Sequence, residues 1–308
     1  MLRWRLVSSF VVLSILIGLM ISDYRMLGVD RPGVWLGPLV FGFAALAVRE
    51  MLDLFSGLSG APRTTPITWT TYVGTLCIVA AWCAPIAWKP YPVDCPLGKL
   101  GWPMLAITFG IGLAFLGEML RYREPGDVVV RVAMGMLIMV YVGVLSGFLV
   151  ALRLFHSNTA GMVALISTIA IVKMSDTGAY AFGRLFGRHP MAKLLSPKKT
   201  VEGAVGGVLA SILTAWLVLN ILAPRWFPEV CAPQAAWRWV AYGAVLAAVG
   251  MVGDLAESLI KRDGRRKDSS SWLPGLGGVL DMLDSLLLTA PVSYACWIAG
   301  LIGPLSNG

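Results

Sequence analysis

Two stretches in the second half of the chain gather acidic side chains at helical spacing. In the first, positions i, i+3, i+4 and i+7 hold Asp254, Glu257, Ser258 and Lys261. In the second, positions i, i+3 and i+4 hold Asp281, Asp284 and Ser285. Residues at these spacings lie on one face of a helix. Clustered carboxylates repel one another and are costly to keep ionised near lipid, so a bound divalent cation is expected to hold them. Oxygen ligands with room for water and phosphate suit Mg²⁺.

Ordinary ion pairing at a solvated helix end is the alternative reading of these acids. For Glu257 and Lys261, which are four residues apart, we keep pairing and metal binding as equal alternatives. For Asp281 and Asp284 we favour metal binding, because the helix that follows offers them no basic partner. Asp254 follows an apolar run and is read in the same way.

Basic side chains accompany the acids on what we expect to be the same side of a membrane. They are Lys198, Lys199, Lys261 and Arg262. A metal ion with several cations in a small volume suits a polyphosphate with four negative charges. The phosphate-binding motif G-x-x-x-x-G-K-[ST] does not occur, and the glycines at 203, 206 and 207 are typical of close helix packing.

Nucleotidyl transfer is the reaction that this set of residues fits. A phosphomonoester nucleophile has a second pKa near 6 and is already largely ionised at neutral pH. It needs no general base, and the acidic and basic clusters contain no histidine. The protein must then align the substrates and neutralise the transferred phosphoryl group and the leaving pyrophosphate.

The elements that position these residues are expected to be membrane-spanning helices. Of the 308 residues, 57% are hydrophobic and only 14% are charged, too few to cover a soluble globule. Apolar runs near the required length of about 20 residues occur at 6–22, 34–49, 70–88, 103–120, 132–151, 159–174, 203–223, 236–257 and 284–303. We therefore expect an all-α polytopic membrane protein with about nine transmembrane helices. Residues 1–170 would form amino-terminal transmembrane helices, and residues 171–308 a catalytic region with cytoplasmic loops.

The charge pattern orients these helices. With a cytoplasmic amino terminus and nine alternating spans, 17 basic residues fall on the cytoplasmic side and 7 outside, and Lys173 lies within a span. Cytoplasmic loops carry such an excess of Lys and Arg. We expect a multi-pass protein of the cytoplasmic membrane whose active site faces the cytoplasm. The first run is expected to be an uncleaved helix, since no A-x-A-like cleavage site follows it. The net charge of +8 comes without a nucleic-acid recognition motif, so no nucleic-acid partner is expected.

A long motif near the carboxyl end resembles the signature of the phosphatidate cytidylyltransferase family, also called CDP-diacylglycerol synthases. The signature reads S-x-x-K-R-x4-K-D-x-G/S-x2-hydrophobic-P-G-H-G-G-hydrophobic-x-D-R-hydrophobic-D. It is matched at Ser258, Lys261, Arg262, Lys267, Asp268, Pro274, Gly275, Gly277, Gly278, Asp281 and Asp284. Two upstream segments, S-D-T-G-A-Y at 175–180 and S-P-K-K-T-x-E-G at 196–203, are also similar to the family.

The resemblance implies an enzyme of phospholipid biosynthesis that converts CTP and phosphatidate into CDP-diacylglycerol and pyrophosphate. It implies metal binding by Asp254, Asp281 and Asp284, with Asp281, Asp254 and Lys261 as catalytic residues. Substrate contacts are implied for Ser175, Asp176, Lys198, Lys199, Ser258, Arg262, Lys267 and Asp268. The expected cofactor is Mg²⁺, with or without a monovalent cation such as K⁺. The expected partners are the two substrates, the lipid bilayer and a second copy of the chain in a homodimer.

Two positions depart from the family signature. Leu276 stands where the family has histidine, and Met282 where it has arginine, whose planar fork is hard to replace at a phosphate. Because the acidic residues and the lysines persist, we expect an active enzyme. The alternatives are a CTP-dependent kinase of a polyprenol-type lipid alcohol, a transporter that uses buried acids, and a catalytically silent membrane scaffold. Product analysis distinguishes the kinase, because it would release CDP and not pyrophosphate. A transporter would need carboxylates near the middle of the membrane, and a silent scaffold would fail to bind CTP.

Overall fold

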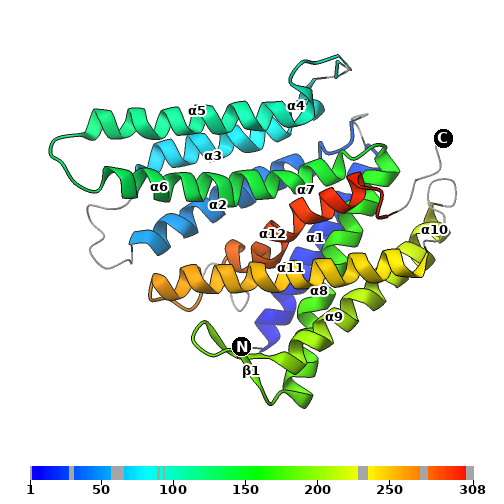
Figure 1. Cartoon of the computed structure of the whole chain (residues 1–308). Helices are drawn as coiled ribbons and strands as arrows, with labels where there is room; N and C mark the ends of the chain where they lie inside the picture. Colours follow the sequence, from blue (N-terminus) through cyan, green and yellow to red (C-terminus); the bar gives the residue numbers. More distant parts are fainter. Residues whose placement is uncertain are drawn as a thin grey trace. The chain divides into compact units, whose positions relative to one another are not determined.

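The computed structural model describes residues 2–27, 31–56, 66–88, 91–92, 94–227, 235–270 and 277–302, with side chains from residue 11 onward. Helices make up most of this part, and each predicted apolar run falls on helical structure (Figure 1). The elements are α1 (Leu2–Tyr24), α2 (Gly37–Ser56), α3 (Thr68–Trp82), α4 (Ala84–Ala87), α5 (Gly98–Arg121), α6 (Val128–Ile138), η2 (Met139–Val144), α7 (Leu145–Arg153), α8 (Asn158–Phe186), β1 (Pro190–Ala192), β2 (Ser196–Thr200), α9 (Val201–Trp216), η3 (Leu217–Leu222), α10 (Ala223–Trp226), α11 (Ala236–Asp263) and α12 (Val279–Ile298).

Six helical segments of the described chain are long and apolar enough to cross a membrane. They are Gly98–Arg121, Val128–Arg153, Asn158–Phe186, Val201–Trp226, Ala236–Asp263 and Val279–Ile298. Two of them are built from consecutive helices joined through the wider π-helical turns η2 and η3. The chain is therefore a largely α-helical polytopic membrane protein, as its composition predicts.

The other three predicted spans differ from these six in length or charge. The run at 70–88 is divided at Cys83 between α3 and α4, and Pro85 lies in the first turn of α4. The 15 residues of α3 reach about 22 Å, short of the roughly 30 Å apolar core of a bilayer. Helix α2 carries three charged residues, Arg49, Glu50 and Asp53. In α1 the described apolar part is Val11–Tyr24. The total of nine crossings thus stays a prediction.

The described chain forms two compact units, with boundaries inside α11 and α12. Unit 1 comprises residues 1–150 and 260–282, and unit 2 comprises residues 151–259 and 283–308. These units reflect packing within the chain. The division at residue 170 proposed from the sequence concerns function and stays a prediction.

Unit 1 is built around α3, which packs along α5 and also contacts α2 and η2 (Figure 1). Two glycines permit the close approach of α3 and α5. A Cβ atom at Gly74 would lie 3.4 Å from the Cα atom of Gly110 and 2.7 Å from the Met139 side chain. The inner face of α2 is apolar and fully buried at Ala47 and Val48. This packing fixes α2, which carries Glu50.

Unit 2 is built around the contact between α8 and α9. A Cβ atom at Gly178 would lie 2.4 Å from Ala210 Cβ, and one at Gly203 would lie 2.8 Å from the Ala179 carbonyl oxygen. Gly206 and Gly207 likewise face side chains or backbone of α8. The prediction that these glycines serve helix packing is confirmed.

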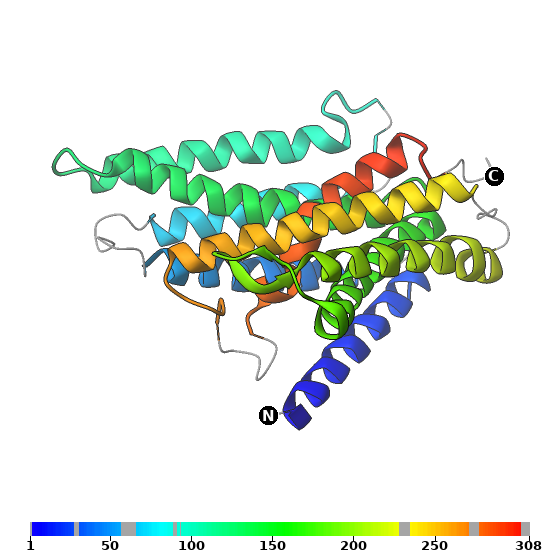
Figure 2. The same cartoon turned by 60° about the horizontal axis from the view of Figure 1, so that its bottom comes forward.

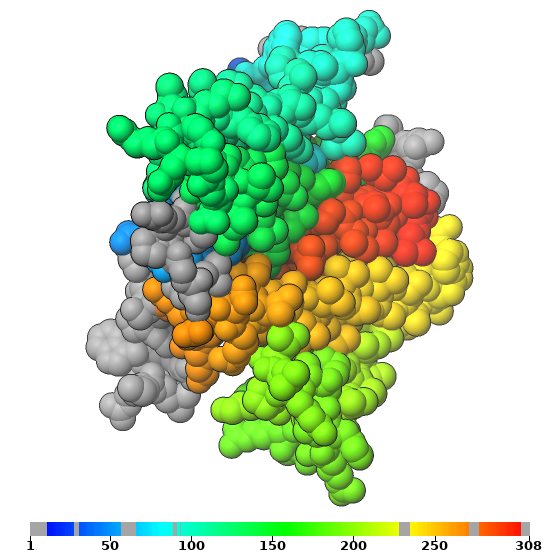
Figure 3. Space-filling model, turned by 60° about the vertical axis from the view of Figure 1, so that its left-hand side comes forward, coloured from blue at the N-terminus to red at the C-terminus, as the bar shows by residue number. Residues whose placement is uncertain are grey.

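A short antiparallel hairpin joins α8 to α9, an element that the all-α prediction did not contain. Strands β1 and β2 pair Pro190 with Thr200 and Ala192 with Ser196. Figures 2 and 3 show this light-green segment leading into α9, with its surface standing out beside the yellow α11. The Thr200 side chain accepts a hydrogen bond from Gly203 N and so caps α9. The extended backbone of β2 sets the directions in which the side chains of Lys198 and Lys199 point.

A buried polar network connects α8, α11 and α12 inside unit 2. The Tyr242 hydroxyl lies 2.8 Å from Ser293 Oγ and accepts a hydrogen bond from Trp297 Nε1 at 3.1 Å. Thr168 Oγ1 lies 2.6 Å from Ser293 Oγ. Tyr242 itself is completely buried. Because paired polar groups in an apolar interior have defined geometry, this network fixes the two helices that bring the acidic residues together.

Candidate active site

An acidic group lies where α11 and α12 meet in unit 2. Asp254 and Glu257 come from α11 and Asp284 from α12, and one carboxylate oxygen of each lies within 4.8 Å of the others. Gly253 makes this approach possible, because a Cβ atom there would lie 2.7 Å from the Asp284 carbonyl oxygen. Glu257 is completely buried, so it does not lie at a solvated helix end.

Two lysines and a further aspartate surround this group. Lys199 of β2 forms an ion pair with Asp254. Asp176 of α8 lies 3.7 Å from Lys173 Nζ and accepts a hydrogen bond from Ser285 Oγ at 3.4 Å. Side chains alternate along a strand, so Lys198 is exposed while Lys199 is half-buried against Asp254.

The donor set of the acidic group fits a hard divalent cation. It offers only carboxylate oxygens, the ligands that Mg²⁺ and Ca²⁺ prefer, and offers neither sulfur nor imidazole. Three carboxylates so close together repel one another, and the ammonium of Lys199 offsets only part of their charge. Such a group can hold a metal ion and, through the neighbouring lysines, an anionic ligand of that ion.

A second polar cluster lies in unit 1, at the start of α12. Lys261 Nζ donates to Asp281 Oδ1 at 2.6 Å, and both side chains are largely buried. The backbone N–H of Gly278 donates to Asp281 Oδ2 at 2.8 Å, the contact that the third residue of a helix makes in a capping box. The basic partner of Asp281 thus comes from the preceding helix, α11. The expectation that Asp281 has no basic partner is therefore wrong.

Glu50 of α2 completes this second cluster, although no sequence motif identifies it. The residue is 5% exposed, and its carboxylate accepts hydrogen bonds from the hydroxyls of Ser269 and Ser270. It also accepts hydrogen bonds from the backbone N–H groups of Val279 and Leu280. Glu50, which lies in the amino-terminal half of the chain, therefore binds residues of the carboxyl-terminal signature region.

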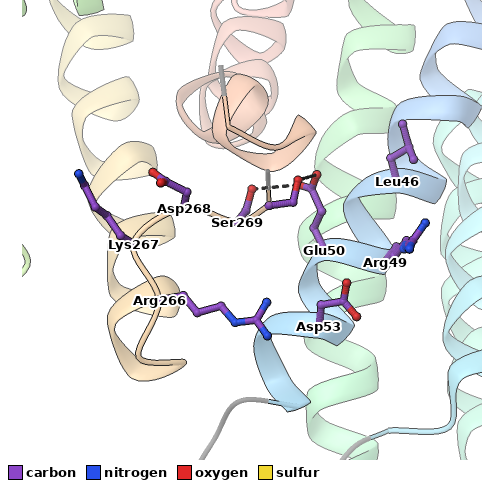
Figure 4. Close-up of a pocket in the computed structure, with 9 residues that line it drawn as sticks. Leu46, Arg49, Glu50, Asp53, Arg266, Lys267, Asp268 and Ser269 are labelled. Carbon is purple, nitrogen blue, oxygen red and sulfur yellow. Dashed lines mark hydrogen bonds between the residues drawn. The ribbon is translucent and has the colours of Figure 1, made fainter. Parts of the chain in front are cut away.

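A pocket of about 520 Å³ opens beside Glu50 within unit 1. Figure 4 shows Arg266 extending from the loop after α11 toward α2, which contributes Arg49 and Asp53. The full lining is Leu46, Arg49, Glu50, Asp53, Arg266, Lys267, Asp268, Ser269 and Ser270. The pocket therefore includes two predicted substrate-binding residues, Lys267 and Asp268, and adds the cations Arg49 and Arg266.

The predicted site residues fall into both units. Unit 1 contains Lys261, Arg262, Lys267, Asp268 and Asp281, and unit 2 contains Ser175, Asp176, Lys198, Lys199, Asp254, Ser258 and Asp284. Ser175 is buried on α8, where a Cβ atom at Gly207 of α9 would lie 3.2 Å from its Oγ. Ser258 is half-buried on α11, and Arg262 is exposed.

Of the two departures from the family signature, only Met282 can be placed. It is half-buried in the first turns of α12. Leu276, Pro274 and Gly275 lie outside the described residues. Gly277 has a φ of +84°, a conformation that favours glycine, so the chain turns sharply just before α12 begins.

The sequence left Glu257 between two alternatives, and it did not identify Glu50, Ser269, Arg49 and Arg266 as neighbours of the predicted residues. One signal for Glu50 was available. It directly follows the apolar run at 34–49, and ionisable residues next to lipid-spanning segments are functional candidates.

Comparison with known proteins finds one family model, described as the cytidylyltransferase family, that matches residues 4–299. A Chlamydia muridarum protein named phosphatidate cytidylyltransferase is 42% identical over 142 residues, which cover 46% of this chain and 45% of that protein. Proteins of the same name from Staphylococcus saprophyticus and Staphylococcus aureus are 38% and 34% identical over 152 residues, 49% of this chain and 54% of theirs. The chain thus matches about half the length of these curated relatives.

Proposed function

We propose that this chain, which belongs to the cytidylyltransferase family, transfers the cytidylyl group of CTP to phosphatidate and releases pyrophosphate. The substrates are taken from the names of its relatives. The observation that carries the proposal is the carboxylate group of Asp254, Glu257 and Asp284 with Lys199 paired to it. These residue types can hold a metal ion and a triphosphate at one place.

Asp254, Glu257 and Asp284 would hold Mg²⁺, with or without a monovalent cation such as K⁺. When bound, the divalent ion neutralises charge on the nucleotide phosphates and polarises the α-phosphate. Lys199 would bind a phosphate oxygen once Asp254 engages the metal. Lys173 and Asp176 lie next to this group and would orient the nucleotide.

Asp281 and Lys261, which belong to unit 1, would also take part in the reaction. Asp281 was predicted as a metal ligand and remains a proposed catalytic residue. Its carboxylate pairs with the Lys261 ammonium, and an ammonium is a donor that phosphate oxygens accept. The adjacent pocket, lined by Lys267, Arg266 and Arg49, supports a substrate-binding role for this side of unit 1.

The reaction forms a bond between a phosphate oxygen of phosphatidate and the α-phosphorus of CTP. It breaks the bond from that phosphorus to the oxygen that bridges to the β-phosphate, so pyrophosphate leaves with the bonding electrons. The attacking phosphate is already ionised, and the proposed residues therefore supply charge and alignment. A lipid-alcohol kinase would have to deprotonate a neutral hydroxyl, which none of the proposed residues is suited to do.

In the proposed membrane arrangement, nine helices cross the cytoplasmic membrane, the amino terminus is cytoplasmic and the site faces the cytoplasm. The excess of basic residues in the loops 187–200 and 264–270 supports this orientation. The homodimer rests on the family resemblance.

The test is an assay of the purified protein in detergent with CTP, phosphatidate and Mg²⁺. We expect equal amounts of pyrophosphate and lipid-linked CMP, and no turnover after chelation of the metal. Asp254→Asn should lower turnover at least about 100-fold with the protein still folded. Glu118→Gln, which changes a buried glutamate paired with Arg131 in unit 1, should retain activity. Unchanged turnover in Asp254→Asn, or CDP as the nucleotide product, would contradict the proposal, and failure to bind CTP with Mg²⁺ would favour a silent scaffold.

A further inference from the structure

The carboxylate of Glu50 binds the amino-terminal end of α12 from another helix. Val279 N donates to Glu50 Oε1 at 2.9 Å, and Leu280 N donates to Oε2 at 2.8 Å. These are the first two residues of α12, whose N–H groups have no acceptor within the helix. A negative charge at this end also interacts favourably with the helix dipole. Glu50 therefore caps α12 although it lies 229 positions before Val279 in the chain.

Gly278 explains why this cap comes from α2. It precedes α12 and has no side chain with which to cap the helix. A Cβ atom at this position would lie 2.4 Å from Glu50 Oε2 and 2.1 Å from Ser269 Oγ. Any other residue at 278 would displace the Glu50 carboxylate. The second glycine of the G-G pair in the signature is thus matched to a glutamate on α2.

The same contacts connect Glu50 to Asp281. Ser269 Oγ lies 3.0 Å from Glu50 Oε2 and 2.6 Å from Asp281 Oδ2, so one hydroxyl bridges the two carboxylates. Ser269 N donates to Asp281 Oδ2 at 3.0 Å, and Ser270 Oγ donates to Glu50 Oε1 at 2.9 Å. Glu50 therefore holds both the loop after α11 and the first turn of α12, the two segments that flank the Asp281–Lys261 pair.

We propose that Glu50 is a positioning residue for Asp281 and Lys261, acting through the amino-terminal turn of α12 and Ser269. The role rests on the proposed function, because it presumes that Asp281 and Lys261 serve the transfer reaction. A buried glutamate of purely structural importance would alter stability. Substitution of a positioning glutamate would both loosen the amino-terminal end of α12 and lower the turnover number.

Glu50→Gln is the informative substitution because it preserves size. It removes the charge and places an amide N–H₂ where donors from Val279, Leu280 and the two serines need acceptors. We expect hydrogen exchange at the amides of Val279 and Leu280 to accelerate at least about tenfold. We also expect kcat to fall at least tenfold while KM for CTP changes less than threefold. Glu50→Asp keeps the charge and should restore part of both.

Glu118→Gln is the matched control, because Glu118 is also a buried glutamate of unit 1 and accepts from Arg131 at 2.7 Å. It should lower the melting temperature without changing exchange at 279–280 or kcat. If Glu50→Gln does not fold, Gly278→Ala tests the same contact, since its methyl group would meet the Glu50 carboxylate.

Unchanged exchange at 279–280 in Glu50→Gln would overturn the cap, and accelerated exchange with unchanged kcat would overturn the positioning role. Absence of transfer in the unsubstituted protein would instead reject the proposed function, and the exchange measurement would still decide whether Glu50 caps α12.

Discussion

Asp254 pairs with the Lys199 ammonium and, in the proposed function, also binds a metal ion together with Glu257 and Asp284. A divalent ion at this group would take oxygen ligands from all three carboxylates. Lys199 would then contact a phosphate. In this account Lys199 competes with the metal before CTP binds and assists it afterwards.

This competition predicts opposite effects of one lysine on two measurements. Lys199→Met should tighten Mn²⁺ binding, measured by calorimetry without nucleotide, roughly fivefold, because a cation near the acidic group is removed. The same variant should lower kcat/KM for CTP at least about tenfold.

Lys198→Met is the matched comparison, since its exposed side chain lies on the other face of β2. Its Mn²⁺ affinity should equal that of the unsubstituted protein. Equal Mn²⁺ affinity in all three proteins would contradict the assignment of the acidic group as a metal site.

At the scale of the elements, the glycines of α8 and α9 determine how closely these helices approach. A methyl group at Gly178 would lie 2.4 Å from Ala210 Cβ and 2.8 Å from the Gly206 carbonyl oxygen, so α8 and α9 would have to separate. Because α8 carries Asp176 and Lys173, and β2 leads directly into α9, separation would also disturb the surroundings of Asp254.

Gly178→Ala should therefore destabilise the protein by about 1–3 kcal/mol, the usual cost of overpacking, seen as a lower melting temperature in detergent. Gly112→Ala is the control, because a Cβ atom at Gly112 of α5 meets nothing within 4 Å. It should leave the melting temperature unchanged or raise it slightly. The same loss in both variants would show that helix propensity, not the close contact, governs the effect.

The elements also show which features local sequence reveals. Apolar runs located the helices, and the glycines at 203, 206 and 207 predicted close helix packing, because both signals lie within one segment; the packing partner, α8, was not predicted. The hairpin at 190–200 was missed because its strands have three and five residues, too short for a period-2 pattern. The apolar run at 284–303 covers only the later part of α12, which begins at Val279 and includes Asp281, as the helical spacing of Asp281, Asp284 and Ser285 predicted.

The candidate site was predictable where a motif exists and hidden where contacts are long-range. Asp254 and Asp284 lie close together, which agrees with the shared role implied by the family resemblance. Glu50 was not predicted, since its role depends on the approach of segments separated by more than 200 positions, and no spacing rule covers such a distance. Glu257 was left between two alternatives, because sequence does not reveal whether a side chain at a helix end is buried.

For the whole molecule, the proposed topology places Cys95 outside and the hairpin in the cytoplasm. In that topology the six apolar helical segments between Gly98 and Ile298 cross the membrane in turn, and alternate loops would lie on opposite sides. In a variant with the other cysteines replaced by serine, Cys95 should react with a membrane-impermeant maleimide in intact cells.

A single cysteine introduced by Lys198→Cys in a cysteine-free background should react only after the membrane is permeabilised. Labelling of both positions from the same side would contradict the alternating arrangement and would place the proposed site in a different compartment.

The most direct test of nucleotidyl transfer follows the phosphorus atoms of CTP into the lipid. Purified protein is incubated with phosphatidate, Mg²⁺ and CTP labelled with ³²P at either the α or the γ position, and the lipid fraction is counted. The account predicts that the α label enters the lipid and the γ label leaves as pyrophosphate. Entry of the γ label into lipid, or absence of both labels from lipid with a folded protein, would contradict it.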